Sequence, residues 1–137
     1  MVYHNIYDSW SWIGGHADGC ADLASVALRE LEEETGVAHA RIIPVGQREG
    51  SSESPLLSLE VLTVNGHEKR GSYVCSHLHL NVTYLAVADE ADALRVKPDE
   101  NSGVAWVPLN EVVARSSEPW IRTRIYQKIL DRLKRLG

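Results

Sequence analysis

A short acidic helix is the feature that most constrains how this chain folds. The segment RELEEETG, residues 29–36, places four glutamates within five successive positions. Asp22 suits the N-cap and Gly36 suits the left-handed position after the last turn, so the sequence predicts a helix over residues 23–35. Glutamates at helical-neighbour spacing repel each other by about 0.2–0.5 kcal/mol per pair in water. Such a helix needs a nearby positive charge if it packs against the rest of a folded domain.

The glutamates are not spread evenly around this helix. At about 100° per residue, Glu30, Glu33 and Glu34 fall within an arc of about 100°, and Glu32 points elsewhere. The apolar stripe beside them, which is expected to pack on a sheet, consists of Ala24, Ala27, Leu28 and Leu31. Mg²⁺ and Mn²⁺ prefer carboxylate and carbonyl oxygens as ligands. The helix alone leaves two interpretations open, a divalent metal site or an acidic face in solvent.

Composition and charge narrow the classes of partner. The chain has 137 residues, of which 44% are hydrophobic and 24% charged, and we expect one domain over residues 1–137. Its net charge of −5 argues against a nucleic-acid or membrane partner. Cys20 and Cys75 form no C-x-x-C pair, no apolar run reaches the roughly 20 residues of a membrane span, and the first residues are unlike a signal peptide. We therefore expect a cytoplasmic protein.

The remaining periodicity indicates a mixed α/β protein. Two short extended pieces with a turn near residues 5–9 are expected before residue 13. Further strands are predicted at residues 40–50, 56–64, 77–88 and 104–109, with a turn at Asn65-Gly66. A short helix is expected over residues 109–115 and an amphipathic one from residue 118 to the end. Because the chain has no Phe, the rings expected to fill much of its core include Trp10, Trp12, Tyr84 and Trp106.

The residues around the acidic helix carry a specific pattern. From Gly15 to Val37 the chain reads G-x5-A-x7-R-E-L-x-E-E-x-G-V. This pattern resembles the signature of the Nudix (MutT-like) hydrolase superfamily, G-x5-E-x7-R-E-U-x-E-E-x-G-U, where U is aliphatic. The segments HLHLNVTYLAVADE and PDENSGVAWVPLNEV also look like later strands of that fold. The resemblance makes residues 15–37 the Nudix box of a single Nudix domain.

The resemblance implies a Nudix α/β/α sandwich with a mixed central sheet. Family members usually carry a longer segment before the box, which includes a first strand of that sheet. Here only 13 residues precede Gly14, so part of the usual N-terminal strand region is expected to be missing. An uncovered sheet edge invites pairing with another chain. We therefore expect a homodimer, or else an impaired fold.

The resemblance also implies a set of metal ligands. In this family the box binds a divalent metal, Mg²⁺ or Mn²⁺, against a diphosphate. The ligands would be Glu30, Glu33, Glu34 and the main-chain carbonyl of Gly14. Arg29 would orient the glutamates through a charge-assisted hydrogen bond. Its alternative role is that of a surface cation beside an acidic cluster.

The implied activity is hydrolysis of a nucleoside diphosphate linked to another group, with a metal that lowers the pKa of a bound water. The general base is left open among Glu33, Glu34 and Glu100, and Glu100 has a solvated loop acid as its alternative. Candidate substrate contacts are Gly15, His16, His77 and His79. The two strand histidines also fit a surface or hydrogen-bonded role. The partner would be a small nucleoside diphosphate derivative, whose identity the sequence leaves open.

Two positions depart from the pattern of the family. Ala21 stands where the box has a glutamate, and Asp18 or Asp22 could compensate. Ile13 stands where many relatives have proline, which makes the entry into the loop less rigid. These departures keep a second function open: a Nudix module that binds nucleotide or metal but is catalytically weak.

Overall fold

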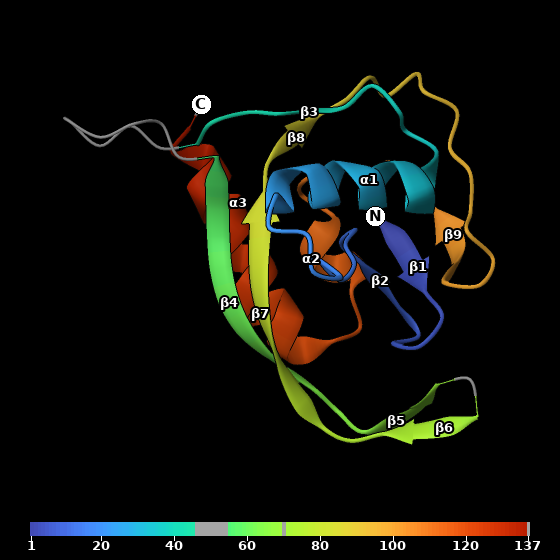
Figure 1. Cartoon of the computed structure of the whole chain (residues 1–137). Coiled ribbons are helices and arrows are strands. Elements are labelled where there is room, and N and C mark those ends of the chain that lie inside the picture. Colours follow the sequence, from blue (N-terminus) through green and yellow to red (C-terminus); the bar gives the residue numbers. More distant parts are fainter. Residues whose placement is uncertain (46–54, 70, 137) are drawn as a thin grey trace. The chain divides into compact units, whose positions relative to one another are not determined.

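The computed structural model describes residues 1–45, 55–69 and 71–136. The chain separates into two compact units, Met1–Ile43 with Ala86–Gly137, and Pro44–Leu85. Among the described residues, the first unit contains the helices, including the acidic one, and two small antiparallel sheets, and the second unit is built from strands (Figure 1). This content agrees with the predicted mixture of helices and strands. The two units are described separately below.

The acidic helix forms where the sequence predicts it. Helix α1 spans Leu23–Thr35. The Asp22 carboxylate accepts a hydrogen bond from the main-chain N–H of Ser25 at 3.1 Å, which caps the first turn. Gly36 adopts φ 81° and its N–H donates to the carbonyl of Glu32 at 2.8 Å, which ends the last turn. Both predicted caps are confirmed.

The buried face of α1 differs from the predicted apolar stripe. The buried residues are Val26, Glu30, Glu34 and Thr35, whereas Ala24, Ala27, Leu28 and Leu31 are half-buried. Val26, Glu30 and Glu34 follow each other at intervals of four residues, so they share one side of the helix. The prediction was wrong because it placed the carboxylates beside the buried face rather than on it.

A three-stranded sheet pairs the start of the chain with a distant segment. Strands β1 (Val2–His4), β2 (Ser9–Ser11) and β9 (Asn101–Val104) are antiparallel and lie in the order β2-β1-β9. The Tyr3 and Trp10 rings meet edge to face, with centroids 5.7 Å apart. The two predicted extended pieces before residue 13 are therefore confirmed as a hairpin. The predicted strand 104–109 was wrong in its bounds, because pairing with β1 places β9 earlier in the chain.

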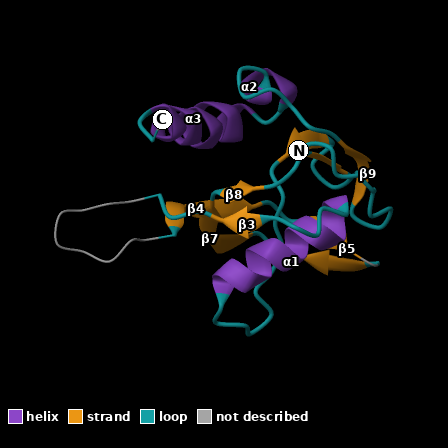
Figure 2. Ribbon diagram, turned by 90° about the horizontal axis from the view of Figure 1, so that it is seen from above, coloured by secondary structure: helices purple, strands orange, loops and turns teal. Residues whose placement is uncertain are grey.

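The other strand pair of this unit lies between two helices. Strands β3 (Arg41–Ile42) and β8 (Ala86–Val87) are antiparallel, and Figure 2 shows α1 and α3 on opposite sides of them. The predicted strand 40–50 is thus represented by β3, and its part from residue 46 lies outside the described residues. Tertiary pairing, rather than local apolar pattern, sets the length of so short a strand.

The end of the chain forms a helix of two kinds. A short helix α2 (Val112–Arg115) precedes a π-helical segment η1 (Ile121–Tyr126), which continues as α3 (Gln127–Lys134). Tyr126 is buried, and its hydroxyl accepts a hydrogen bond from the main-chain N–H of Trp12 at 2.9 Å. The Trp12 ring is half-buried and meets the Tyr126 ring edge to face, with centroids 5.6 Å apart, so its predicted core role holds only in part. Trp106 is 45% exposed, so its predicted core position was wrong.

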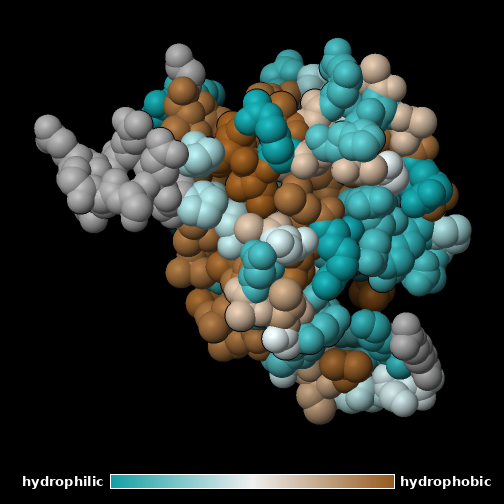
Figure 3. Space-filling model, turned by 45° about the horizontal axis from the view of Figure 1, so that its top comes forward, coloured by the Kyte–Doolittle hydropathy of each residue, from teal (hydrophilic) through white to brown (hydrophobic). Residues whose placement is uncertain are grey.

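The surface of the molecule is mixed in polarity. Figure 3 shows a broad area of hydrophilic residues with hydrophobic residues beside it. Exposed large apolar side chains of the first unit include Trp106, Leu109 and Trp120. Within the described residues, no helix is both long and apolar enough to pass through a membrane.

The second unit is a long antiparallel hairpin. Strand β4 (Leu56–Val64) pairs with β7 (His77–Tyr84), and β5 (His67–Lys69) pairs with β6 (Ser72–Val74). The chain reverses between Lys69 and Ser72, where Gly71 adopts φ 76°. The predicted turn at Asn65-Gly66 was wrong because Gly66 lacks the positive φ that an Asn-Gly hairpin turn requires.

Candidate functional site

A cluster of four carboxylates forms where α1 meets the segment before β9. Glu30 and Glu34 are buried on α1, with 8% and 3% of their surface exposed, whereas the Glu33 side chain is 46% exposed. The fourth carboxylate, Glu100, belongs to the distant segment. Burial and, after it, the negative charge of Glu100 raise the pKa of Glu34, so the two segments are coupled electrostatically. The four acids are called the acidic cluster below.

Arg29 links the acidic cluster to the glycine loop before α1. Its Nη2 lies 3.1 Å from Glu30 Oε1, and its Nε lies 3.9 Å from Glu33 Oε1. The same Nη2 donates to the main-chain carbonyl of His16 at 3.4 Å. Three groups from the loop and the helix thus face one guanidinium. These contacts agree with the predicted orienting role of Arg29 and equally with its alternative, a surface cation beside an acidic cluster, so the role stays a prediction.

Lys97 is a site residue that the sequence analysis missed. Its Nζ lies 3.2 Å from Glu33 Oε2 and 3.0 Å from Glu100 Oε1, so one ammonium joins two of the predicted catalytic acids. Its side chain is 25% exposed. A lysine three residues before Glu100 was the available signal, but its partner Glu33 lies 64 residues away and no local spacing predicts that contact.

Asn101 is the second residue that the sequence analysis missed. It is 1% exposed, and its Nδ2 donates to the main-chain carbonyl of Glu34 at 3.1 Å. Its Oδ1 accepts the main-chain N–H of Lys97 at 3.1 Å. The Lys97 carbonyl in turn accepts the N–H groups of Glu100 and Asn101. One buried amide therefore holds this turn against the end of α1.

Substitution Asn101→Ala is expected to destabilise the protein by about 1–3 kcal/mol, because it leaves the Glu34 carbonyl and the Lys97 N–H without their partner in a buried place. The neighbouring Ser102 is exposed on β9, so Ser102→Ala is a matched control that should change stability by less than about 0.5 kcal/mol. Urea unfolding followed by circular dichroism would measure both. Equal midpoints for the two variants would contradict the anchoring role of Asn101.

The carboxyl group of Glu34 has a raised pKa in the folded protein. Burial, followed by the negative charges of Glu100 and Glu30, raises its pKa to about 7. The N–H of Gly14 and the charge of Lys97 act in the opposite direction. Its Oε2 is buried and has no hydrogen-bond partner among the described residues. This carboxylate therefore lacks a full set of partners within the described protein.

The paired glycines fit the loop to α1 in different ways. A Cβ placed on Gly15 would overlap the carboxylate of Glu30, so a residue with a side chain cannot occupy that position without displacing it. A Cβ on Gly14 would meet nothing within 4 Å. Close approach to Glu30 explains why the chain needs glycine at position 15.

The predicted histidines lie in different surroundings. His16 is exposed, and the contact with Arg29 uses its carbonyl rather than its ring. His77 and His79 belong to the second unit, where their Nε2 atoms lie 2.9 Å apart. On the same face of that hairpin, the buried Glu60 accepts hydrogen bonds from Ser58 and Asn81. Nothing in the sequence marks Glu60 as buried, because it lies among apolar and polar residues that alternate irregularly along the predicted strand.

The charge balance of the cluster suits a divalent cation. Four carboxylates face two side-chain cations, Arg29 and Lys97, which leaves a net charge of −2 when all are ionised. Within residues 1–45, 55–69 and 71–136, no three acidic, histidine or cysteine side chains form a ready metal cage. Glu33 contacts Lys97, whereas a buried oxygen of Glu34 has no hydrogen-bond partner in the described part of the chain. The donor set consists of carboxylate oxygens, which hard cations prefer, and Arg29 and Lys97 contact three of its four members, Glu30, Glu33 and Glu100.

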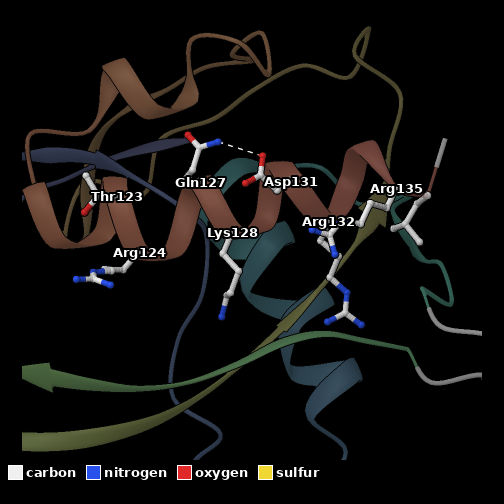
Figure 4. A pocket seen from close by; sticks show the side chains of 8 residues that line it. Thr123, Arg124, Gln127, Lys128, Asp131, Arg132 and Arg135 are labelled. Atoms are coloured by element: carbon white, nitrogen blue, oxygen red, sulfur yellow. Dashed lines mark hydrogen bonds between the residues drawn. The ribbon is translucent and has the colours of Figure 1, made fainter.

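A groove at the end of the chain, within the first unit, contains none of the predicted site residues. It has a volume of about 660 Å³ and is lined by η1, α3 and the two residues after α3. Figure 4 shows Arg124, Lys128 and Arg132 along this helix, and Gln127 donating to Asp131. No member of the acidic cluster lines this groove.

Comparison with known families agrees with the resemblance of the box. The model of the NUDIX domain matches residues 3–129, which is most of the chain. No curated protein matches the chain. The match includes the glycine loop, α1, Lys97 and Glu100. The chain therefore belongs to the Nudix family.

Proposed function

We propose that this protein uses Mg²⁺ or Mn²⁺ to hydrolyse a phosphoric anhydride bond in a nucleoside diphosphate derivative. Nudix domains in general hydrolyse nucleoside diphosphates linked to another group, so the family match supports a pyrophosphohydrolase. The observation that carries the proposal is the acidic cluster, in which four carboxylates face two side-chain cations. An unbalanced set of oxygen ligands at the box helix is suited to a cation bound against a diphosphate.

The residues that would hold the metal are Glu30, Glu33, Glu34 and the carbonyl of Gly14. When bound, the metal would offset the charge of the diphosphate and lower the pKa of a water. Arg29 fixes the Glu30 carboxylate at 3.1 Å and lies near Glu33, so it keeps two of the ligands in place. Gly15 permits the close approach of the loop to Glu30. These residues would prepare the site before substrate arrives.

The proton of the attacking water would pass to a carboxylate of the cluster. Glu33, Glu34 and Glu100 are the candidates, and two of them share the ammonium of Lys97. Glu34 is the buried candidate, and Glu33 and Glu100 are the accessible ones. The exposed His16 beside the loop would contact substrate phosphate. His77 and His79 stay proposed substrate contacts of the second unit.

A single Nudix domain over residues 1–137, a cytoplasmic location and a homodimer complete the proposal. Strand β2 lies at the edge of the sheet β2-β1-β9, and an open edge can pair with a second copy. The expected result is a dimer in light scattering at micromolar concentration. A monomer at all concentrations would contradict this part of the proposal and would leave the hydrolase assignment in place.

The second candidate function is a binding module with weak catalysis. The observation that favours it is Ala21, which replaces the box glutamate and is exposed in the structure. Such a module would keep Glu30, Glu33 and Glu34 as metal ligands. It would bind a nucleoside diphosphate derivative with metal and release product slowly or not at all.

A substrate panel distinguishes the two functions. Purified protein would be incubated with ADP-ribose, dinucleoside polyphosphates, NADH, nucleotide sugars and nucleoside triphosphates, each with Mg²⁺, Mn²⁺ or EDTA. The proposal expects products that end in a phosphate group and that form only with metal. The rate of their formation should be about 100-fold lower in Glu33→Gln. Glu32→Gln is the matched control, because Glu32 is exposed on the same helix, outside the cluster. Tight binding without turnover would favour the module, and the absence of both would contradict the proposal.

A further inference from the structure

We propose that the ammonium group of Lys97 competes with the divalent cation for Glu33, and that Lys97 thereby sets the metal affinity of the site. The inference rests on the proposed function, since it concerns the same carboxylates. It assigns a role to a residue outside the Nudix box, which belongs to the segment before β9. Lys97 is in this sense a positioning residue, because it would act through the ligands.

The contacts of Lys97 place a cation on a proposed metal ligand. Its Nζ lies 3.2 Å from Glu33 Oε2, while the other oxygen of Glu33 faces Arg29 at 3.9 Å. Both oxygens of Glu33 are therefore directed at protein cations. A divalent ion that takes Glu33 as a ligand has to approach the oxygens that these cations hold. Like charges repel at such distances, so metal and ammonium oppose each other at Glu33.

Lys97 is held close to the cluster from two directions. Its main-chain N–H donates to the buried Asn101 side chain at 3.1 Å, which fixes the start of the lysine. Its Nζ also contacts Glu100 Oε1 at 3.0 Å. When Glu33 turns to a metal, the ammonium keeps Glu100 as a partner. The lysine thus stays beside the site and continues to oppose the charge of the metal.

The buried carboxylate of Glu34 favours metal binding over the ion pair between Lys97 and Glu33. Glu34 Oε2 is buried and has no hydrogen-bond partner among the described residues, and Glu34 is 3% exposed. The Lys97 ammonium contacts the two accessible acids, Glu33 at 3.2 Å and Glu100 at 3.0 Å. It acts on Glu34 only through the electrostatic effect of its charge. A cation that reaches Glu34 satisfies a group that Lys97 leaves unsatisfied. On metal binding, Glu33 would therefore exchange the Lys97 ammonium for the metal ion, while the carboxylates of the site are already close together.

The test compares Mn²⁺ binding to the full chain and to Lys97→Gln by isothermal titration calorimetry, without substrate. The proposal expects Lys97→Gln to bind Mn²⁺ about threefold to tenfold more tightly, which corresponds to the loss of one or two partly exposed ion pairs. Lys97→Arg keeps the charge and should stay within about twofold of the wild type. Lys134→Gln is the matched control, because Lys134 forms an exposed ion pair with Asp131 on α3.

The outcomes separate this inference from the proposed function. Equal or weaker Mn²⁺ binding by a folded Lys97→Gln, with binding by the wild type, would overturn the role of Lys97 and leave the metal site standing. A wild type that binds no Mn²⁺ would overturn both. Folding of each variant is checked by circular dichroism. If Lys97→Gln alone fails to fold, Lys97→Met, which keeps the length of the stem without the charge, takes its place in the same titration with the same expected gain.

Discussion

Substitution Glu34→Gln is expected to remove about 3 kcal/mol of pH dependence from the stability of the protein in EDTA, and to slow metal-dependent hydrolysis at least about 100-fold. Burial, followed by the charges of Glu100 and Glu30, raises the pKa of this carboxyl from 4.5 to about 7 in the folded state. A shift of about 2.5 pKa units corresponds to about 3 kcal/mol. Glutamine has no such titration, so the effect should disappear.

The sign of this effect follows from proton binding. Between pH 4.5 and about 7 the folded protein keeps a proton on Glu34 that the unfolded chain gives up. The stability of the wild type therefore falls as pH rises through this window, and the full cost is present above pH 7. The groups that act on Glu34 are Glu100, Glu30, Lys97 and the N–H of Gly14. Burial lowers the pKa of the nearby Met1 amine, and the charge of Glu34 acts against that lowering. Lys97 and the Gly14 N–H oppose the shift of Glu34, and burial outweighs them.

The measurement is urea unfolding of wild type and Glu34→Gln at pH 5, 6, 7 and 8. The difference between the two free energies of unfolding should change by about 3 kcal/mol across this range, in favour of the variant at high pH. Glu32→Gln serves as control, because an exposed glutamate on the same helix should give a nearly constant difference. Parallel curves for wild type and Glu34→Gln would contradict the buried, uncompensated state of this carboxylate.

Substitution Gly15→Ala is expected to weaken Mn²⁺ binding at least about tenfold and to slow hydrolysis about 100-fold, because a Cβ at this position overlaps the Glu30 carboxylate. The Glu30 side chain is only 11% exposed, so it has little room to move away. Its displacement would break the contact with Arg29 and cost about 1–3 kcal/mol of stability.

The neighbouring glycine provides the control for folding. A Cβ on Gly14 meets nothing within 4 Å, and Gly14 does not adopt a positive φ. Gly14→Ala should therefore keep its stability or gain about 0.4–1 kcal/mol through a less flexible unfolded chain. Urea unfolding would measure the stability of both variants, and Mn²⁺ titration would measure their metal affinity. A Gly15→Ala protein with wild-type Mn²⁺ affinity would contradict the proposed position of Glu30 as a ligand.

Prediction from sequence succeeded where the determining interactions are local. The caps of α1 depend on Asp22 and Gly36, which lie within a few residues of the groups that they bind. Strand β4 was predicted with its observed bounds, because Leu and Val recur along it and loop residues flank it on both sides. The turn at Asn65-Gly66 failed although it is a strong local signal. The extended pairing of β5 with β6 moved the reversal to the neighbourhood of Gly71.

Prediction failed where distant segments meet. Asn101 contacts the carbonyl of Glu34 across 67 residues, and Lys97 contacts Glu33 across 64. Neither residue carries a spacing that marks it, because a single sequence does not show which loop packs on which helix. The buried face of α1 was misjudged for the same reason. A helix wheel ranks residues by polarity alone, whereas here the turn at residues 97–101 packs on α1 at Glu34 and the loop at Gly15 lies against Glu30.

The sequence by itself determined the box: a capped helix with glutamates at positions 30, 33 and 34, preceded by glycines and an arginine at fixed spacing. These features are local, and hydrogen bonds between near neighbours specify them. Only the tertiary structure decided which of those glutamates are buried. It also decided that Lys97 contacts Glu33 and that Asn101 binds the main-chain carbonyl of Glu34. Burial and long-range ion pairs depend on the surroundings that other segments supply, and those surroundings set both the charge of Glu34 and the cation that Glu33 faces.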